Sequence, residues 1–192
     1  MGLFDDWHHC PRCGAGITPA DGRVECGACG YVAYANPAPA VCALLTDGDG
    51  RVLLTRRRWE PYAGMWDLPG GFLGEDEHPL DGLRRELLEE TGLRVEPDEW
   101  FGAFLVPYGE GPGTRTVLNL VWLARVVGGT PRAADDVTEL GWFAPDELPP
   151  THEIAMAEPL ERWLKLTGAA RDTGRIHFGP DPKGQGPDVG LS

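Results

Sequence analysis

The sequence predicts an α/β domain preceded by a small cysteine-rich module. Strand-like apolar runs alternate with amphipathic helical segments, and clusters of glycine and proline separate them. Four of the five cysteines form two close pairs near the N-terminus. The chain has 192 residues, of which 42% are hydrophobic and 24% charged, and this composition fits one folded domain with a small appendage.

The chain is strongly acidic, with 30 Asp or Glu against 17 Lys or Arg and a formal net charge of -13. Because bulk negative charge repels a phosphate backbone, we expect no nucleic-acid partner. No stretch approaches the roughly 18 to 20 apolar residues of a membrane span, and the N-terminus, with Asp5 and Asp6, does not resemble an export signal. We therefore expect a soluble, cytoplasmic protein without a membrane partner.

The first module, residues 1–34, is too short to bury a core of its own. Its cysteine pairs can place four thiolates tetrahedrally around one Zn²⁺ (Cys10, Cys13, Cys26 and Cys29). Gly14 and Gly30 follow the pairs, as tight turns around a metal require. We predict a structural zinc ribbon. A thiol redox motif is the alternative, although it would use only one pair.

Strand-like runs at residues 41–45, 52–55 and 117–127 mark the main domain, residues 35–167. The Asp-Gly-Asp-Gly turn at 47–50 predicts a hairpin between the first two runs. The remaining cysteine, Cys42, lies within the first run. We interpret it as a small buried side chain, with a reactive thiol as the alternative.

Two segments predict helices. In residues 79–90 the apolar positions recur at helical spacing, Pro79 suits a first turn and Gly92 suits the end. Residues 154–166 form a second amphipathic stretch that we expect to pack on the domain. After it, residues 168–192 contain few large apolar side chains to offset the entropy of ordering, so we expect a disordered tail.

The first predicted helix carries a group of carboxylates. Glu86 and Glu90 stand one turn apart on the same side, and Glu89 lies beside them. Such acids repel one another unless a cation neutralises them, and hard oxygen ligands suit Mg²⁺ or Mn²⁺. The alternative is a solvated acidic face. The glycines and Glu77 that precede the helix favour the metal site.

Residues 71–93 resemble the Nudix box, a motif with constrained positions at set spacing. The matching residues are Gly71, Glu77, Arg85, Glu86, Leu87, Glu89, Glu90, Gly92 and Leu93. Relatives often have glycine at the position of Asp76 and alanine at that of Gly82; neither departure touches a fixed position.

The resemblance implies the fold of a Nudix hydrolase, an α/β/α sandwich on a mixed sheet. It also implies roles for particular residues. Glu86, Glu89, Glu90 and the Gly70 carbonyl match the ligands of the catalytic metal. Arg85 and Glu77 match a supporting ion pair.

Family members often supply a further acid from a loop before a Trp-Phe pair. Here Trp142-Phe143 follows both Asp136 and Glu139, so we consider both as catalytic candidates, with ordinary surface acids as the alternative.

The ribbon followed by the box resembles the zinc-ribbon Nudix group, which includes NADH, FAD and ADP-ribose pyrophosphatases. The segment that marks the NADH enzymes is absent at residues 101–108. Pro107 lies near the position of a proline associated with ADP-ribose enzymes, and Tyr108 near that of a tyrosine associated with dinucleoside polyphosphate enzymes. We take both, with Gly71 and Arg58, as candidates for substrate binding.

Several aromatic residues can stack on an adenine or flavin ring, although core packing is the alternative for each: Trp59, Tyr62, Trp66, Phe104 and Tyr108.

The predicted function is metal-dependent hydrolysis of the diphosphate bond in a nucleoside diphosphate linked to another moiety, as in ADP-ribose, FAD or NAD(H). One alternative is a pyrophosphohydrolase of nucleoside triphosphates or oxidised nucleotides. Another is a non-catalytic module that senses nucleotides or binds nucleic acid, against which the complete set of box carboxylates argues. Enzymes of this family often dimerise, so a homodimer is a further expectation from the resemblance.

Overall fold

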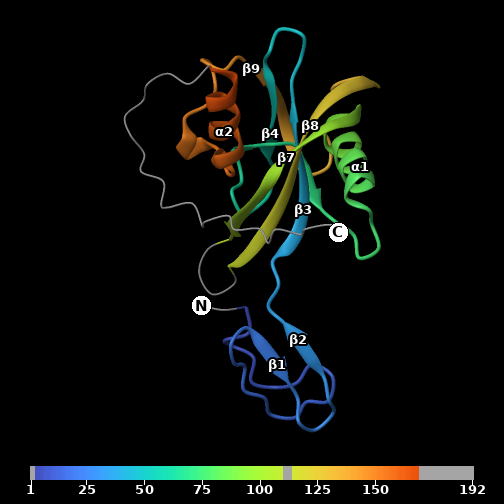
Figure 1. Cartoon of the computed structure of the whole chain (residues 1–192), viewed down its shortest axis with the longest axis vertical. Coiled ribbons are helices and arrows are strands. Elements are labelled where there is room, and N and C mark those ends of the chain that lie inside the picture. Colours follow the sequence, from blue (N-terminus) through green and yellow to red (C-terminus); the bar gives the residue numbers. More distant parts are fainter. Residues whose placement is uncertain (1–2, 110–113, 169–192) are drawn as a thin grey trace, which may run out of the picture.

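The computed structural model describes residues 3–109 and 114–168. The N-terminal module lies at one end of the molecule (Figure 1) and contains the antiparallel strands β1 (Arg23–Glu25) and β2 (Val32–Tyr34).

A mixed sheet of four strands forms the centre of the main domain. Its order is β6 (Gly70–Phe72), β3 (Ala38–Leu45), β8 (Arg115–Gly129) and β7 (Leu93–Tyr108). β3 and β8 run parallel, from the pair Ala38↔Val117 to the pair Leu45↔Ala124, and the other neighbours are antiparallel. The predicted mixed sheet is confirmed.

A second sheet has the order β5 (Trp66–Asp67), β4 (Val52–Arg57) and β9 (Val137–Phe143), with antiparallel neighbours. The turn at residues 47–50 connects it to β3, but the predicted hairpin was wrong. β3 pairs with β6 and β8, whereas β4 pairs with β5 and β9, so the two strands lie in different sheets and share only the isolated bridge Thr46↔Val52. Asp47 stabilises this turn because its carboxylate accepts hydrogen bonds from the N–H groups of Asp49 and Arg51.

Among residues 3–109 and 114–168, two α-helices cover the sheets (Figure 1). α1 (Pro79–Thr91) begins after His78, whose side chain accepts a hydrogen bond from the Leu80 N–H, and it ends at Gly92, where φ is 69°. α2 (Ala157–Thr167) starts three residues after the predicted position. The prediction was wrong there because Ile154 is buried and bridges Trp66 after the short 3₁₀ helix η2 (Thr151–Glu153).

Strand β3 separates two apolar cores, which confirms the α/β/α layering. Val41, Ala43 and Leu45 pack with the leucines of α1, whereas Cys42 and Leu44 belong to the core beneath α2. Cys42 is buried, as predicted.

The proposed tail, apart from Gly168 at the end of α2, lies outside the described residues. Within the described residues, no helix is long and apolar enough to cross a membrane.

Candidate active site

Two glycines of β6 allow this strand to approach β3 and α1. Gly70 has a φ of 149°, and a Cβ there would collide with the Val41 carbonyl. A Cβ on Gly71 would lie 2.5 Å from the Glu86 carboxyl carbon. The Gly70 N–H donates a 2.9 Å hydrogen bond to Glu90 Oε2, which joins β6 to the acidic side of α1.

Arg85 organises the acids around it. Its Nε and Nη2 donate to the two carboxylate oxygens of Glu77 over 2.6 and 2.7 Å, forming the ion pair that the motif predicts. Its Nη1 donates to Glu86 Oε1 over 2.8 Å and to Glu89 Oε2 over 2.9 Å. The hydrogen bonds from Arg85 lower the pKa of Glu77 to about 2.

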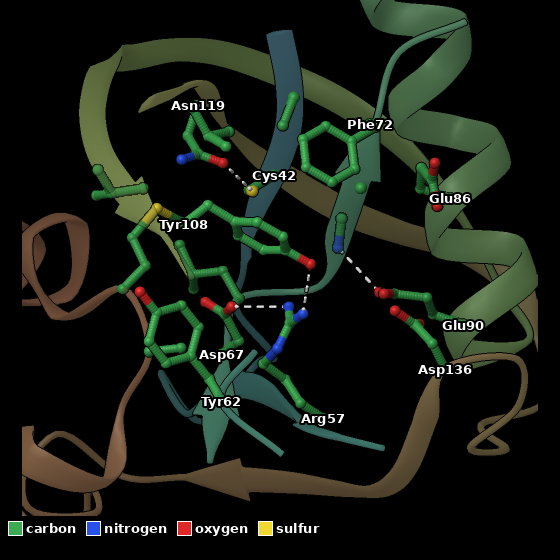
Figure 2. Close-up of a pocket in the computed structure, with 18 of the residues that line it drawn as sticks. Cys42, Arg57, Tyr62, Asp67, Phe72, Glu86, Glu90, Tyr108, Asn119 and Asp136 are labelled. Atoms are coloured by element: carbon green, nitrogen blue, oxygen red, sulfur yellow. Dashed lines mark hydrogen bonds and ion pairs between the residues drawn. The ribbon is translucent and has the colours of Figure 1, made fainter. Parts of the chain in front are cut away.

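Glu86, Glu90 and Asp136 come together beside α1 (Figure 2). Burial raises the pKa of Glu86 and raises that of Glu90 well above its usual range, and the charge of Asp136 adds to both shifts. Neighbouring carboxylates of this kind, one buried and two half-buried, fit a divalent cation, which would remove their repulsion. Glu89 lies further out, with 47% of its side chain exposed, and bonds Arg85.

A cavity of about 260 Å³ extends from these acids to β3 and β8 (Figure 2). Tyr108 forms edge-on contacts with Tyr62 and with Phe72, at ring-centroid distances of 6.2 and 5.4 Å. Arg57 Nη2 donates to the Tyr108 hydroxyl over 3.0 Å, and Arg57 Nη1 lies 3.5 Å from Asp67 Oδ2. Burial raises the pKa of Asp67 to about 6.

The structure places some of the site residues predicted from the sequence in the cavity lining and others outside it. Gly70, Gly71, Pro107, Tyr108 and Asp136 line the cavity. Glu139 does not, because it forms an exposed ion pair of 3.2 Å with Arg56. Arg58 also lies outside the lining: it donates to the Val137 carbonyl and lies over the Trp59 ring. Its neighbour Arg57 lines the cavity instead.

Among the aromatic candidates, Tyr62 and Tyr108 line the cavity, whereas Trp66 and Phe104 pack in the core. Sequence reasoning missed Asp67 and Asn119, which also line the cavity. One signal was available for Asn119, because it is a polar residue in a strand that is otherwise apolar over residues 117–124.

The four cysteines of the N-terminal module form a compact cluster, as predicted. Their sulfur atoms all lie within 4.8 Å of one another, with 3.7 Å between the sulfurs of Cys10 and Cys29 and 3.6 Å between those of Cys13 and Cys26. Hydrogen bonds from the backbone of Cys29 and Ala28 lower the pKa of Cys26 to about 7, whereas burial and hydrogen bonds with the other cysteines raise the pKa of Cys29 to about 12. This all-sulfur donor set suits Zn²⁺.

Comparison with known proteins agrees with this geometry. The chain is 34% identical over 119 residues to an ADP-ribose pyrophosphatase of Methanocaldococcus jannaschii, covering 62% of this chain and 69% of that protein. It is 29% identical over 145 residues to the NAD-capped RNA hydrolase NudC of Pseudomonas aeruginosa, covering 73% of this chain and 49% of that protein. The chain thus spans between about half and two thirds of the length of these relatives.

Among solved structures, a NUDIX hydrolase from Nitrosomonas europaea superposes with a TM-score of 0.67 at 26% identity, covering 85% of this chain and 93% of that one. The NUDIX domain family matches residues 36–164, which include both sheets of the main domain, α1 and most of α2. The chain therefore belongs to the Nudix hydrolase family.

Proposed function

We propose that this protein hydrolyses the diphosphate bond of a nucleoside diphosphate joined to a second moiety, with ADP-ribose, FAD or NAD(H) as the candidate substrates. Water would add to one phosphorus while the bridging P–O bond breaks. The products would be a nucleoside monophosphate and a phosphorylated second moiety. The observation that carries the proposal is the group of Glu86, Glu90 and Asp136 at one side of a cavity large enough for part of a nucleotide.

The residues proposed to hold Mg²⁺ or Mn²⁺ are Glu86, Glu89, Glu90 and the carbonyl of Gly70. When bound, such a cation neutralises diphosphate charge and lowers the pKa of the attacking water.

The chain's own groups would orient this site. Arg85 fixes Glu86 and Glu89, and Glu77 in turn holds the Arg85 guanidinium. The Gly70 N–H fixes Glu90. We assign Asp136 to accept a proton from the attacking water because it faces the same space as Glu90. Glu139, held by Arg56, receives no role in this scheme.

Support for the substrate class comes from the relatives. One is named an ADP-ribose pyrophosphatase and another hydrolyses NAD-capped RNA, and both names describe a diphosphate that links a nucleoside to something else. The net charge of -13 favours a small substrate over a capped RNA chain. The cytoplasmic location and the homodimer remain predictions.

The first test is an incubation with Mg²⁺ and ADP-ribose, FAD, NADH, dGTP or a short NAD-capped RNA, with detection of the products. Release of a nucleoside monophosphate from the first three supports the proposal. Cleavage of dGTP alone would instead show a pyrophosphohydrolase of nucleoside triphosphates. Cleavage of the capped RNA alone would show an RNA hydrolase. No product from any of them would overturn hydrolysis itself.

The second test replaces single acids. We expect Glu90→Gln to lower kcat by about 10²-fold or more, because it removes a charged ligand from the proposed metal site. Glu89→Gln should also lower kcat by orders of magnitude. Glu96→Gln is the matched control, since Glu96 pairs with Arg84 away from the cavity. Wild-type turnover in the Glu90 variant would contradict the proposed mechanism.

A further inference from the structure

We propose that Asp67 and Asn119 select the nucleobase of the substrate, and that the second moiety remains outside the cavity. This inference rests on the proposed function, because it assigns the two parts of the proposed substrate to different places.

The cavity volume limits what can enter. Pockets that enclose drug-sized ligands measure roughly 300 to 1,000 Å³, and this one measures about 260 Å³. It therefore has room for one nucleoside-sized group but not for both halves of a molecule such as FAD. The acids beside α1 mark the end where the diphosphate would lie (Figure 2).

The other part of the cavity contains hydrogen-bonding groups suited to a base edge. Cys42 Sγ donates to the Asn119 side-chain oxygen over 3.5 Å, which directs this oxygen toward Cys42 and leaves the amide N–H groups to donate to a ligand. Asp67 Oδ1 accepts the Leu68 N–H over 2.9 Å and Oδ2 faces Arg57, and each carboxylate oxygen has a second lone pair. A donor and an acceptor thus face the same cavity.

Asp67 and Asn119 face the same cavity. Cys42, Asp67 and Asn119 all line the cavity, and Cys42 lies between β6 and β8 in the sheet, hydrogen-bonded to Asn119. The negative charge of Asp67 opposes a phosphate group here. A neutral ring with an N–H beside a ring acceptor satisfies both side chains.

The aromatic side chains that line the cavity are suited to a planar ligand. Phe72 and Tyr108 lie between the acids and the Asn119 side of the cavity in Figure 2, and Tyr62 flanks Asp67. Their faces and edges can pack against a heterocycle. A sugar, by contrast, would leave much of this apolar surface without a matching partner.

The test compares nucleoside diphosphate glucoses that differ only in the base: adenine, guanine, cytosine or uracil. We expect the wild-type kcat/KM to vary by at least about 10-fold between the best and worst base, as hydrogen bonds to a charged group allow. ADP-glucose, ADP-ribose and NADH, which share adenine, should vary less. Asp67→Asn and Asn119→Leu should each reduce the base preference to within about 3-fold. Asp98→Asn, at an exposed acid paired with Arg125, is the matched control.

A purely structural role for Asp67 or Asn119 would lower kcat/KM for all four bases in proportion and leave the preference unchanged, which would overturn the inference. Thermal unfolding of each variant shows whether it is folded. Because cleavage also requires the proposed function, a second readout measures binding of adenosine, guanosine, cytidine and uridine by NMR titration without divalent cation. Base-selective binding that both variants lose supports the inference even if no diphosphate is cleaved. Equal binding of the four nucleosides overturns it even if cleavage occurs.

Discussion

Replacing Gly71 by alanine tests whether the position of Glu86 limits the reaction. The Cβ of the new side chain would lie 2.5 Å from the Glu86 carboxyl carbon and from Oε2, and 2.7 Å from Oε1. Ordinary contacts of a Cβ begin near 3.4 Å. The carboxylate must therefore move by about 1 Å, and its 2.8 Å hydrogen bond with Arg85 must lengthen or break.

A displacement of about 1 Å at a catalytic group can cost about 10²-fold in rate, so we expect kcat/KM to fall by that order. The fold should tolerate the change, because the colliding atoms are the end of a flexible side chain and the backbone φ of Gly71 does not lie in the left-handed region. Steady-state kinetics with ADP-ribose and Mg²⁺ measure the first effect, and thermal unfolding measures the second.

Gly74→Ala provides a control in the loop that follows β6. A Cβ at Gly74 would meet Glu77 at 3.5 and 3.7 Å, which is ordinary contact, and its N–H would still donate to Glu77 Oε2. Activity and stability of this variant should match the wild type. If Gly71→Ala were equally active, the position of Glu86 would not control the reaction, and our reading of the β6–α1 contact would be refuted.

Three further outcomes follow from the structure. Metal analysis should find one zinc per chain, and Cys26→Ser should reduce it; a chain without zinc would refute the ribbon prediction. Burial raises the pKa of Asp67 to about 6 from an ordinary 3.8, so the folded state binds the Asp67 proton more tightly than the unfolded chain does. The stability that this bound proton contributes is therefore lost as the pH rises from about 4 to 6. Denaturant unfolding should show that Asp67→Asn removes about 3 kcal/mol of this pH dependence, and an unchanged pH profile would contradict the shift. Chelation of divalent cations should weaken binding of ADP-ribose but not of adenosine, as calorimetry or NMR titration can measure; equal weakening would count against the proposed division of the cavity.

The parts of the fold that follow a regular period were predictable from sequence. The leucines of α1 recur at helical spacing, and its acids share a face for the same reason. Strand β7 was missed because register shifts interrupt its alternation near Pro97 and Gly102. As the edge strand of its sheet, β7 can include prolines that would disrupt a central strand.

Arg57, and not Arg58, reaches the cavity because side chains alternate along β4: Arg56 pairs with Glu139, and Arg57 points to the opposite face. The pairing of β4 with β9 shifts after Arg56, where one residue of β9, Thr138, is passed over. The same pairing places Glu139 opposite Arg56. Single-residue offsets of this kind depend on the partner strand, which the local sequence does not reveal.

Charge links the two proposed ends of the cavity. Glu86, Glu90, Asp67 and Asp136 all contribute negative potential, and Arg57 is the one basic side chain among the described residues that line it. An anionic diphosphate is therefore repelled unless a cation binds with it. Thermodynamic reciprocity then requires the nucleotide to raise the affinity for the cation by the same factor as the cation raises the affinity for the nucleotide. The binding of a neutral base to Asp67 and Asn119 depends little on the cation, because the base carries no charge for the cation to neutralise. Base selection and metal-dependent hydrolysis can therefore be measured separately, although both occur in one cavity.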